Sequence, residues 1–131
     1  SKMMKEEGLD NIFFRHNKHK LAMSNAVKAL NLKLFADEKY LSPSITAVKT
    51  EGIDAEEFRK TIKNNFDILL AGGQDHMKGK IFRVGHLGYV NDRDIITVVS
   101  AISNTLLNLG KISAQQAGEA LVVASRYLEE N

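Results

Sequence analysis

The residue best suited to chemistry is Arg83, which stands in the apolar run KIFRV at residues 80–84 and is followed by GHLG at residues 85–88. A guanidinium held at the end of a short strand can bind a carboxylate through two parallel hydrogen bonds, a geometry that lysine does not reproduce. Taken alone, such an arginine is more often a surface charge or part of a structural ion pair. Because glycines on both sides leave space for other groups to approach, we interpret Arg83 as an anion-binding residue.

Three further residues could complete a site around Arg83. Gly72 and Gly73 begin a loop that spans about residues 72–79. This loop lacks the longer glycine pattern and the helix start of a phosphate-binding loop, so we expect a mobile loop near the substrate instead. His86, three residues after Arg83, could support the site from behind. It could equally cap the end of a strand or fill a gap near the core.

The other candidate ligands do not predict a metal site. His16 and His19 are three residues apart in an expected helix and could share a face, but a histidine pair without a neighbouring carboxylate is usually solvated. The chain contains no cysteine, which excludes disulfides, thiolate metal ligands and cysteine nucleophiles within it. We therefore predict no metal.

The composition is that of an ordinary soluble domain. The 131 residues are 44% hydrophobic and 26% charged, with a formal net charge of +2. This length is enough for one domain with a core of its own. The near balance of charges makes nucleic-acid binding improbable. The longest apolar stretches, such as residues 95–99, are far shorter than the roughly 20 residues of a membrane span, so we expect no membrane association and a cytoplasmic location.

Periodicity predicts helices at both ends of the chain. A long first helix is expected over residues 9–32, and Asn91 and Gly110 should bound a later helix over residues 91–109. The apolar stripe of that later helix is Ile95, Val99, Ile102, Leu106 and Leu109. Ser113 and Gln116 form a capping box at the start of a last helix, whose stripe is Ala117, Leu121, Ala124 and Leu128.

The middle of the chain alternates between strands and one helix. Residues 44–50 read as a half-buried strand, and Asp54 with Glu57 reads as a capping box that starts a helix. The segments 67–71 and 80–84 are predicted as two more strands. The order α-β-α-β-β-α-α predicts an α+β domain with a small, mainly antiparallel sheet covered by helices.

Short motifs spread over residues 3–109 resemble one protein family in their order and spacing. They resemble the C-terminal small domain of class V, pyridoxal-phosphate-dependent aminotransferases, of the alanine–glyoxylate and serine–pyruvate kind. The motifs are EGL at 7–9, RH at 15–16, SP at 42–43, GID at 52–54, AGG at 71–73 and the run at 80–88. The run at 80–88 is the most specific of them. Residues after Gly110 match less well, so the last helix is predicted from its own periodicity.

The resemblance implies a role for Arg83. In that family, the arginine at this position binds the α-carboxylate of the substrate. The implied reaction moves an amino group between a small amino acid (alanine or serine) and a 2-oxo acid (glyoxylate or pyruvate), with pyridoxal phosphate as the cofactor and a homodimer as the full-length assembly.

The same resemblance places the cofactor machinery outside this chain. The Schiff-base lysine and the phosphate-binding residues belong to a larger N-terminal domain, and no lysine here stands in that setting. We therefore expect residues 1–131 to be a single domain, the small domain of a larger aminotransferase whose large domain is missing. Alone, it should bind no pyridoxal phosphate, should not be catalytic, and should self-associate or lose stability through apolar surface on its first helix.

A second hypothesis comes from a different functional class. The chain could be a stand-alone module that keeps the small-domain fold, and with it a carboxylate site or a protein-interaction surface, without catalysis. A coding region of a few hundred residues upstream would favour the aminotransferase, whereas a start codon just before Met3 would favour the module.

Overall fold

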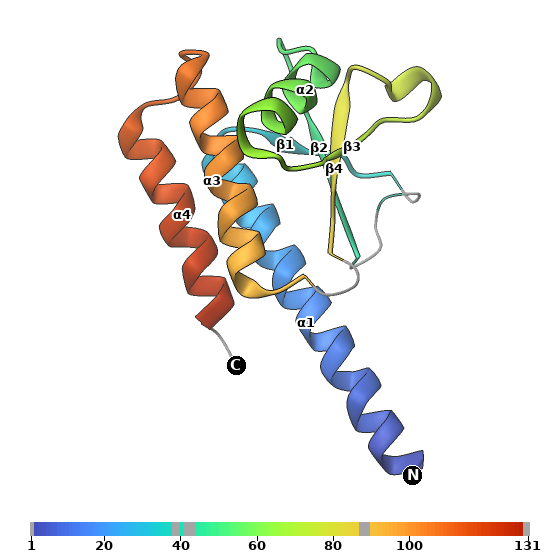
Figure 1. The fold of residues 1–131 in the computed structure, drawn as a ribbon. Helices are drawn as coiled ribbons and strands as arrows, with labels where there is room; N and C mark the ends of the chain where they lie inside the picture. The colour runs from blue at the N-terminus through green and yellow to red at the C-terminus, as the bar shows by residue number, and fades with distance from the viewer. Residues whose placement is uncertain (1, 38–39, 41–43, 87–89, 130–131) are drawn as a thin grey trace.

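Four helices gather on one side of a small four-stranded sheet in the part of the chain that the structure describes (Figure 1). This computed structural model describes residues 2–37, 40, 44–86 and 90–129, except for the side chains of residues 2–7 and 13. The predicted α+β class is confirmed. The elements in chain order are α1 (Lys2–Ala29), β1 (Lys33–Leu34), β2 (Ile45–Lys49), α2 (Ala55–Phe66), β3 (Ala71–Gly72), the short 3-10 helix η2 (Asp75–Met77), β4 (Ile81–Gly85), α3 (Asp92–Asn108) and α4 (Ala114–Glu129).

The sheet has the order β1-β2-β4-β3, and all of its described pairings are antiparallel. In the register of the two central strands, Val48 lies opposite Phe82 and Ala47 lies opposite Arg83. Because successive side chains of a strand point to opposite faces, Phe82 and Arg83 belong to different sides of the sheet. The Phe82 side packs against the helices, with the Phe82 ring stacked on that of Phe58 at a centroid distance of 5.4 Å.

Helix α1 has two unlike halves. Its first turns extend beyond the body of the domain (Figure 1), and Leu9 and Phe14 are 65% and 52% exposed. Its second half packs against α3, α4 and the sheet. The residues buried there recur at helical spacing: Ala22, Met23, Ala26, Val27 and, just after the helix, Leu30. No helix among the described residues is long and apolar enough to cross a membrane.

The first helix ends three residues earlier than predicted. Asn31 takes a left-handed conformation with φ of 63°, and the Leu32 N–H donates to the Val27 carbonyl at 3.1 Å. This is the hydrogen-bonding pattern of a helix C-terminus, in which asparagine replaces the usual glycine. The chain then enters β1, a two-residue strand that the sequence did not predict because so short a segment has no visible alternation.

The strand predicted over residues 67–71 is wrong in its extent. Asp67 caps the C-terminus of α2 in a left-handed conformation (φ 56°), and its N–H donates to the Lys63 carbonyl. Regular pairing begins only at Ala71 and involves Ala71 and Gly72. The short apolar run before Ala71 therefore connects α2 to the sheet instead of pairing within it.

The predicted starts of α2, α3 and α4 are confirmed, whereas α1 begins at Lys2, seven residues before the predicted start at Leu9. Asn91 and Asp94 form a reciprocal capping box at α3. At the start of α2 the Asp54 side chain accepts from the Glu56 N–H instead of from the Glu57 N–H that the predicted capping box requires. Ser113 accepts from the Gln116 N–H at 3.1 Å. The Gln116 side chain turns elsewhere, however, and donates to the Ala29 carbonyl at the end of α1.

The predicted apolar stripes are correct except near helix ends. Leu109 is 52% exposed, because α3 ends at Asn108 before the turn at Gly110 (φ 72°). In α4 the fully buried residue of the first half is Ala120 instead of Ala117.

Candidate functional site

Arg83 lies on the face of the sheet opposite the helices. It is the third of the five residues of β4 (Ile81–Gly85), so it stands in the middle of the strand and not at its end as predicted. Its neighbours in register are Ala47 on β2 and Ala71 on β3, and both have small side chains. The guanidinium therefore has space on both sides along the sheet, although the side chain is partly buried.

Two contacts hold the Arg83 guanidinium. Its Nε donates to the Gly72 carbonyl at 2.8 Å, and its Cζ lies 5.7 Å from the centroid of the Tyr40 ring. Among the described residues, neither Nη group has a hydrogen-bond partner. A guanidinium carries five N–H donors, so four remain for a ligand on the two Nη atoms. This arrangement can bind a carboxylate end-on through two parallel hydrogen bonds.

Gly73 lies against backbone, whereas Gly72 lies against the ends of the Glu56 and Arg59 side chains. A Cβ on Gly72 would lie 2.8 Å from Glu56 Oε2, and one on Gly73 would lie 2.3 Å from the Met77 carbonyl oxygen. Neither residue requires a positive φ. Gly72 belongs to β3, and its carbonyl is the acceptor for Arg83, so the structure places this residue in contact with the predicted anion-binding side chain.

An ion pair on α2 supports this part of the sheet. Arg59 donates from Nε and Nη2 to the two carboxylate oxygens of Glu56 at 2.9 and 2.8 Å, and from Nη1 to the Leu70 carbonyl at 2.6 Å. The hydrogen bonds from Arg59 hold the pKa of Glu56 below its ordinary value. The pair thus connects α2 to the segment that carries Gly72.

His86 lies on the other face of the sheet from Arg83. Its ring is fully buried, and its Nε2 shares a hydrogen bond of 2.8 Å with Thr46 Oγ1 on the side of the sheet that the helices cover. Burial, together with the nearby His19, Lys20 and His16, lowers the pKa of His86 to about 4. The ring is therefore neutral near pH 7. The structure does not bring His86 beside Arg83.

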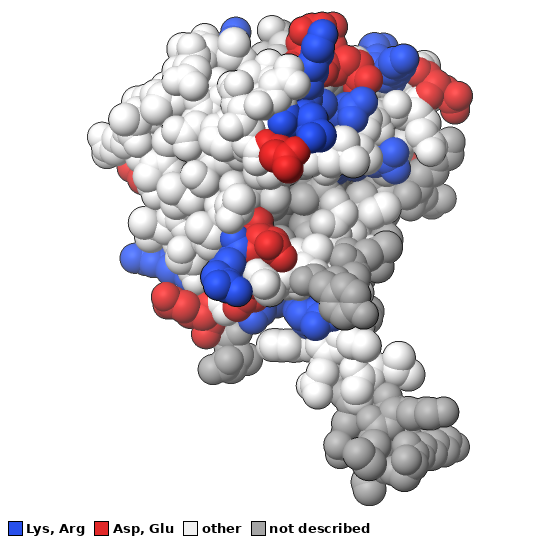
Figure 2. Space-filling view, in the orientation of Figure 1, with Lys and Arg blue, Asp and Glu red and all other residues white. Residues whose placement is uncertain are grey.

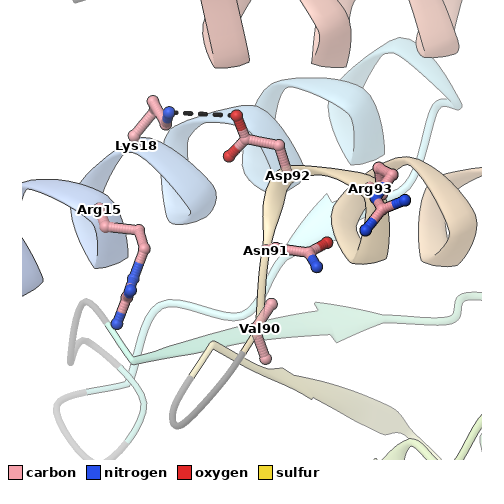
Figure 3. A pocket seen from close by; sticks show the side chains of 6 residues that line it. All are labelled: Arg15, Lys18, Val90, Asn91, Asp92 and Arg93. Carbon is pink, nitrogen blue, oxygen red and sulfur yellow. Dashed lines mark hydrogen bonds and ion pairs between the residues drawn. The ribbon is translucent and has the colours of Figure 1, made fainter.

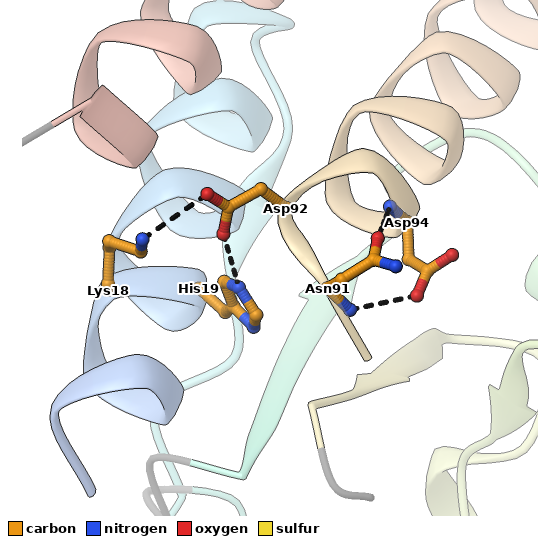
Figure 4. A network of polar contacts seen from close by, with 5 residues as sticks. All are labelled: Lys18, His19, Asn91, Asp92 and Asp94. Carbon is orange, nitrogen blue, oxygen red and sulfur yellow. Dashed lines mark hydrogen bonds and ion pairs between the residues drawn. The ribbon is translucent and has the colours of Figure 1, made fainter. Parts of the chain in front are cut away.

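A polar network joins α1 to the start of α3 (Figure 4). Asp92 accepts from Lys18 Nζ at 3.3 Å and lies 2.9 Å from Nε2 of the buried His19. Partial burial raises the pKa of Asp92, but the bonds to His19 and Lys18 outweigh it and lower the pKa overall. The sequence placed no carboxylate near His19, because 73 residues separate the two in the chain.

A hollow of about 480 Å³ lies beside this network (Figure 3). It is lined by Arg15, Lys18, Val90, Asn91, Asp92 and Arg93. The carboxylate of Asp92 pairs with Lys18, whereas Arg15 and Arg93 leave the lining of the hollow with a net positive charge. Arg83 is not among its lining residues.

The rest of the described surface suggests neither a metal nor a nucleic acid. Acidic and basic side chains intermingle on the face shown in Figure 2 and form no single-sign patch there. No group of three or more histidine, aspartate or glutamate side chains within the described residues could hold a metal ion.

Lys20 on α1 is a half-buried lysine. Burial lowers the pKa of Lys20, but its Nζ donates to the Ile45 carbonyl at 2.6 Å and to the Tyr40 carbonyl at 3.5 Å. An ammonium held by backbone carbonyls is not placed to form a Schiff base. Lys20 therefore does not suit the role of a lysine that carries the cofactor.

The chain is similar to known proteins of two kinds. A soluble hydrogenase 42 kDa subunit from Anabaena cylindrica is 56% identical over 82% of this chain and 28% of that protein. A soluble hydrogenase small subunit from a Synechococcus species is 51% identical over 96% of this chain and 33% of that protein. A serine–glyoxylate aminotransferase from Methylorubrum extorquens is 33% identical over 96% of this chain and 31% of that protein. No protein-family model matches the chain.

Solved structures share the fold over almost the whole chain. The ureidoglycine–glyoxylate aminotransferase of Bacillus subtilis matches with a TM-score of 0.81 and 31% identity, over 95% of this chain and 33% of that one. The pyridoxamine–pyruvate aminotransferase of Mesorhizobium loti has a TM-score of 0.84 at 24% identity, over 98% and 33% of the two chains, and this likeness concerns the fold. The chain spans about a third of the length of the curated relatives it matches.

Proposed function

Because the chain is homologous to about a third of the length of class V aminotransferases, we propose that it is the small, substrate-side domain of such an enzyme and that Arg83 binds the substrate carboxylate. The reaction would move an amino group between a small amino acid, alanine or serine, and a 2-oxo acid, glyoxylate or pyruvate. The observation that carries the proposal is the guanidinium of Arg83, with one donor bound by Gly72 and its Nη donors left for a ligand.

The names of the aminotransferase relatives support the choice of ligand. Their amino donors differ, being serine, ureidoglycine or aspartate, whereas glyoxylate recurs as the partner. Every one of these molecules has a carboxylate next to the reacting carbon. A binding residue common to all of them would recognise that carboxylate, and a planar guanidinium is the side chain that matches it in two parallel hydrogen bonds.

Arg83 would act by orientation and not by proton transfer. A carboxylate held on two Nη groups fixes the direction of the bonds at the neighbouring carbon, so that one of them faces the cofactor. When pyridoxal phosphate is bound in the complete enzyme, it supplies the electron sink for breaking that bond. The neutral, fully buried His86 lies behind the sheet and takes no part in this step.

The hydrogenase names of two relatives are not carried over to this chain. The chain contains no cysteine, so it provides no thiolate ligand for a nickel, iron or iron–sulfur centre. Its similarity to those two proteins covers the same region that matches the aminotransferases.

The test compares Arg83→Lys with Arg93→Lys in the complete protein loaded with pyridoxal phosphate. Arg93 is a matched control because it is an exposed arginine at the start of α3. Loss of a charged, bidentate bond of about 1.5–3 kcal/mol predicts an apparent Kd for alanine or serine that is roughly 10- to 100-fold higher in Arg83→Lys. The cofactor absorbance, which reports both binding and conversion, should show the cofactor still bound.

Two results would contradict the proposal. Equal affinities in wild type, Arg83→Lys and Arg93→Lys would remove Arg83 from the substrate. An intact protein that binds no pyridoxal phosphate would favour a non-catalytic carboxylate-binding or protein-interaction module.

A further inference from the structure

We propose that Tyr40 is a positioning residue for Arg83. The Tyr40 ring and the Gly72 carbonyl together hold the Arg83 guanidinium in place to bind a carboxylate. The inference rests on the proposed function, since it takes Arg83 to be the carboxylate-binding residue. Tyr40 lies 43 positions before Arg83, and the sequence alone gave no reason to connect the two.

The contact between Tyr40 and Arg83 is of the cation–π kind. The Cζ atom of Arg83 is 5.7 Å from the centroid of the Tyr40 ring, within the range of about 6 Å over which the ring attracts a cation. The Gly72 carbonyl constrains the guanidinium at Nε, at 2.8 Å. The hydrogen bond at Nε and the ring contact at Cζ together restrict the movement of the guanidinium.

The ring of Tyr40 is itself held firmly. Tyr40 is 6% exposed and belongs to a small apolar cluster with Ala47 and Ile81. The Phe35 ring packs against it at a centroid distance of 5.6 Å and an interplanar angle of 55°. Such tilted ring pairs are favourable beyond the area they bury. Tyr40 therefore offers a fixed surface for Arg83 to pack on.

The backbone of Tyr40 is tied to two other parts of the chain. Lys20 on α1 donates to the carbonyls of Tyr40 and Ile45, at 3.5 and 2.6 Å. The Tyr40 N–H donates to the Asp37 carbonyl at 2.8 Å. These bonds fix Tyr40 relative to α1 and β2.

Preordering is the physical reason for the effect on binding. An arginine has many rotamers, and fixing it on a ligand costs conformational entropy. When the protein holds the side chain in place beforehand, that cost no longer weakens binding. A residue that acts in this way changes affinity for any carboxylate and does not touch the substrate itself.

The experiment uses the complete protein and an unreactive probe, propionate, whose Kd is measured by calorimetry. Tyr40→Leu removes the ring and should raise the Kd about three- to tenfold. Tyr40→Phe keeps the ring and should stay within about twofold of wild type. Arg83→Lys, measured beside them, reports on the proposed function alone.

A fluorinated series separates the cation–π contact from simple packing. Phenylalanine at position 40 carrying one, two or three fluorines has nearly the same shape but a progressively weaker attraction for a cation. The Kd should rise with each fluorine while the fold stays the same. A constant Kd across the series would overturn the inference, even if Tyr40→Leu proved unstable.

The outcomes distinguish this inference from the proposed function. If Arg83→Lys weakens propionate binding while the Tyr40 variants and the fluorinated series leave it unchanged, the role of Tyr40 is refuted and that of Arg83 stands. If Arg83→Lys has no effect, the carboxylate role of Arg83 fails, and the role of Tyr40 fails with it.

Discussion

The two faces of the sheet differ sharply, although the same strands form both. On the helix side, Phe82 and Val84 of β4 are buried in the main core. On the other side, Ile81 joins a much smaller cluster, and Arg83 follows two residues later on the same face. One face thus stabilises the domain, while the other presents a positioned cation. A five-residue strand serves both purposes because its side chains alternate.

The largest expected effect is on the helix side. Phe82→Ala removes a ring that is fully buried and stacked on Phe58, which should lower the free energy of unfolding by about 3–5 kcal/mol. Leu69→Ala is the control, because Leu69 is 80% exposed and its loss should change stability by less than about 0.5 kcal/mol. Chemical denaturation of the chain measures both. Equal losses in the two variants would mean that the core is elsewhere.

A second effect on the same face depends on pH. The pKa of buried His86 is about 4, below the ordinary value of 6.5, so the unfolded chain takes up a proton at a higher pH than the folded chain does. The stability due to neutral His86 is present above about pH 6.5 and is lost as the pH falls toward 4. It amounts to roughly 3 kcal/mol at most.

His86→Gln should remove that part of the pH dependence. Unfolding free energies measured between pH 7.5 and 4 would then fall less steeply than in wild type. His76→Gln is the control, since His76 is exposed in η2 and its replacement should leave the profile unchanged. A wild-type slope in His86→Gln would show that other groups cause the loss.

A smaller effect is expected beside the open face. Gly73→Ala would place a Cβ 2.3 Å from the Met77 carbonyl oxygen, so the backbone must shift, at a cost of about 1–3 kcal/mol. Gly118→Ala is the contrasting variant, because nothing lies within 4 Å of that position inside α4. Gly118→Ala should stabilise the helix by about 0.5–1 kcal/mol. If Gly73→Ala were as stable as wild type, the loop would be more adaptable than its contacts indicate.

Local sequence signals predicted the helices and the two central strands well. Capping residues such as Asn91 and apolar stripes such as that of α3 act within a few residues, so periodicity reveals them. The strand at residues 67–71 and the missing β1 show the limit. Two-residue strands are held by their partners across the sheet, and a run of apolar residues after a helix looks the same whether it pairs or not.

The candidate site was only partly visible in the sequence. Arg83, Gly72 and Gly73 stood out because of residue type and spacing, and the structure joins Arg83 to Gly72. Tyr40 was not found, because its contact with Arg83 arises only when distant segments meet. His86 is close to Arg83 in sequence but lies on the opposite face, since a separation of three along a strand reverses the side.

The division of roles between the two faces is tested by comparing Arg83→Lys with Phe82→Leu, two variants at adjacent positions of β4 whose side chains lie on opposite faces. Each variant of the complete protein is assayed for alanine affinity and for unfolding free energy. Arg83→Lys should lose affinity about 10- to 100-fold with stability changed by less than about 0.5 kcal/mol. Phe82→Leu should lose stability by roughly 1 kcal/mol and keep its affinity. Unchanged affinity in Arg83→Lys, or equal loss in both variants, would contradict the division between the two faces.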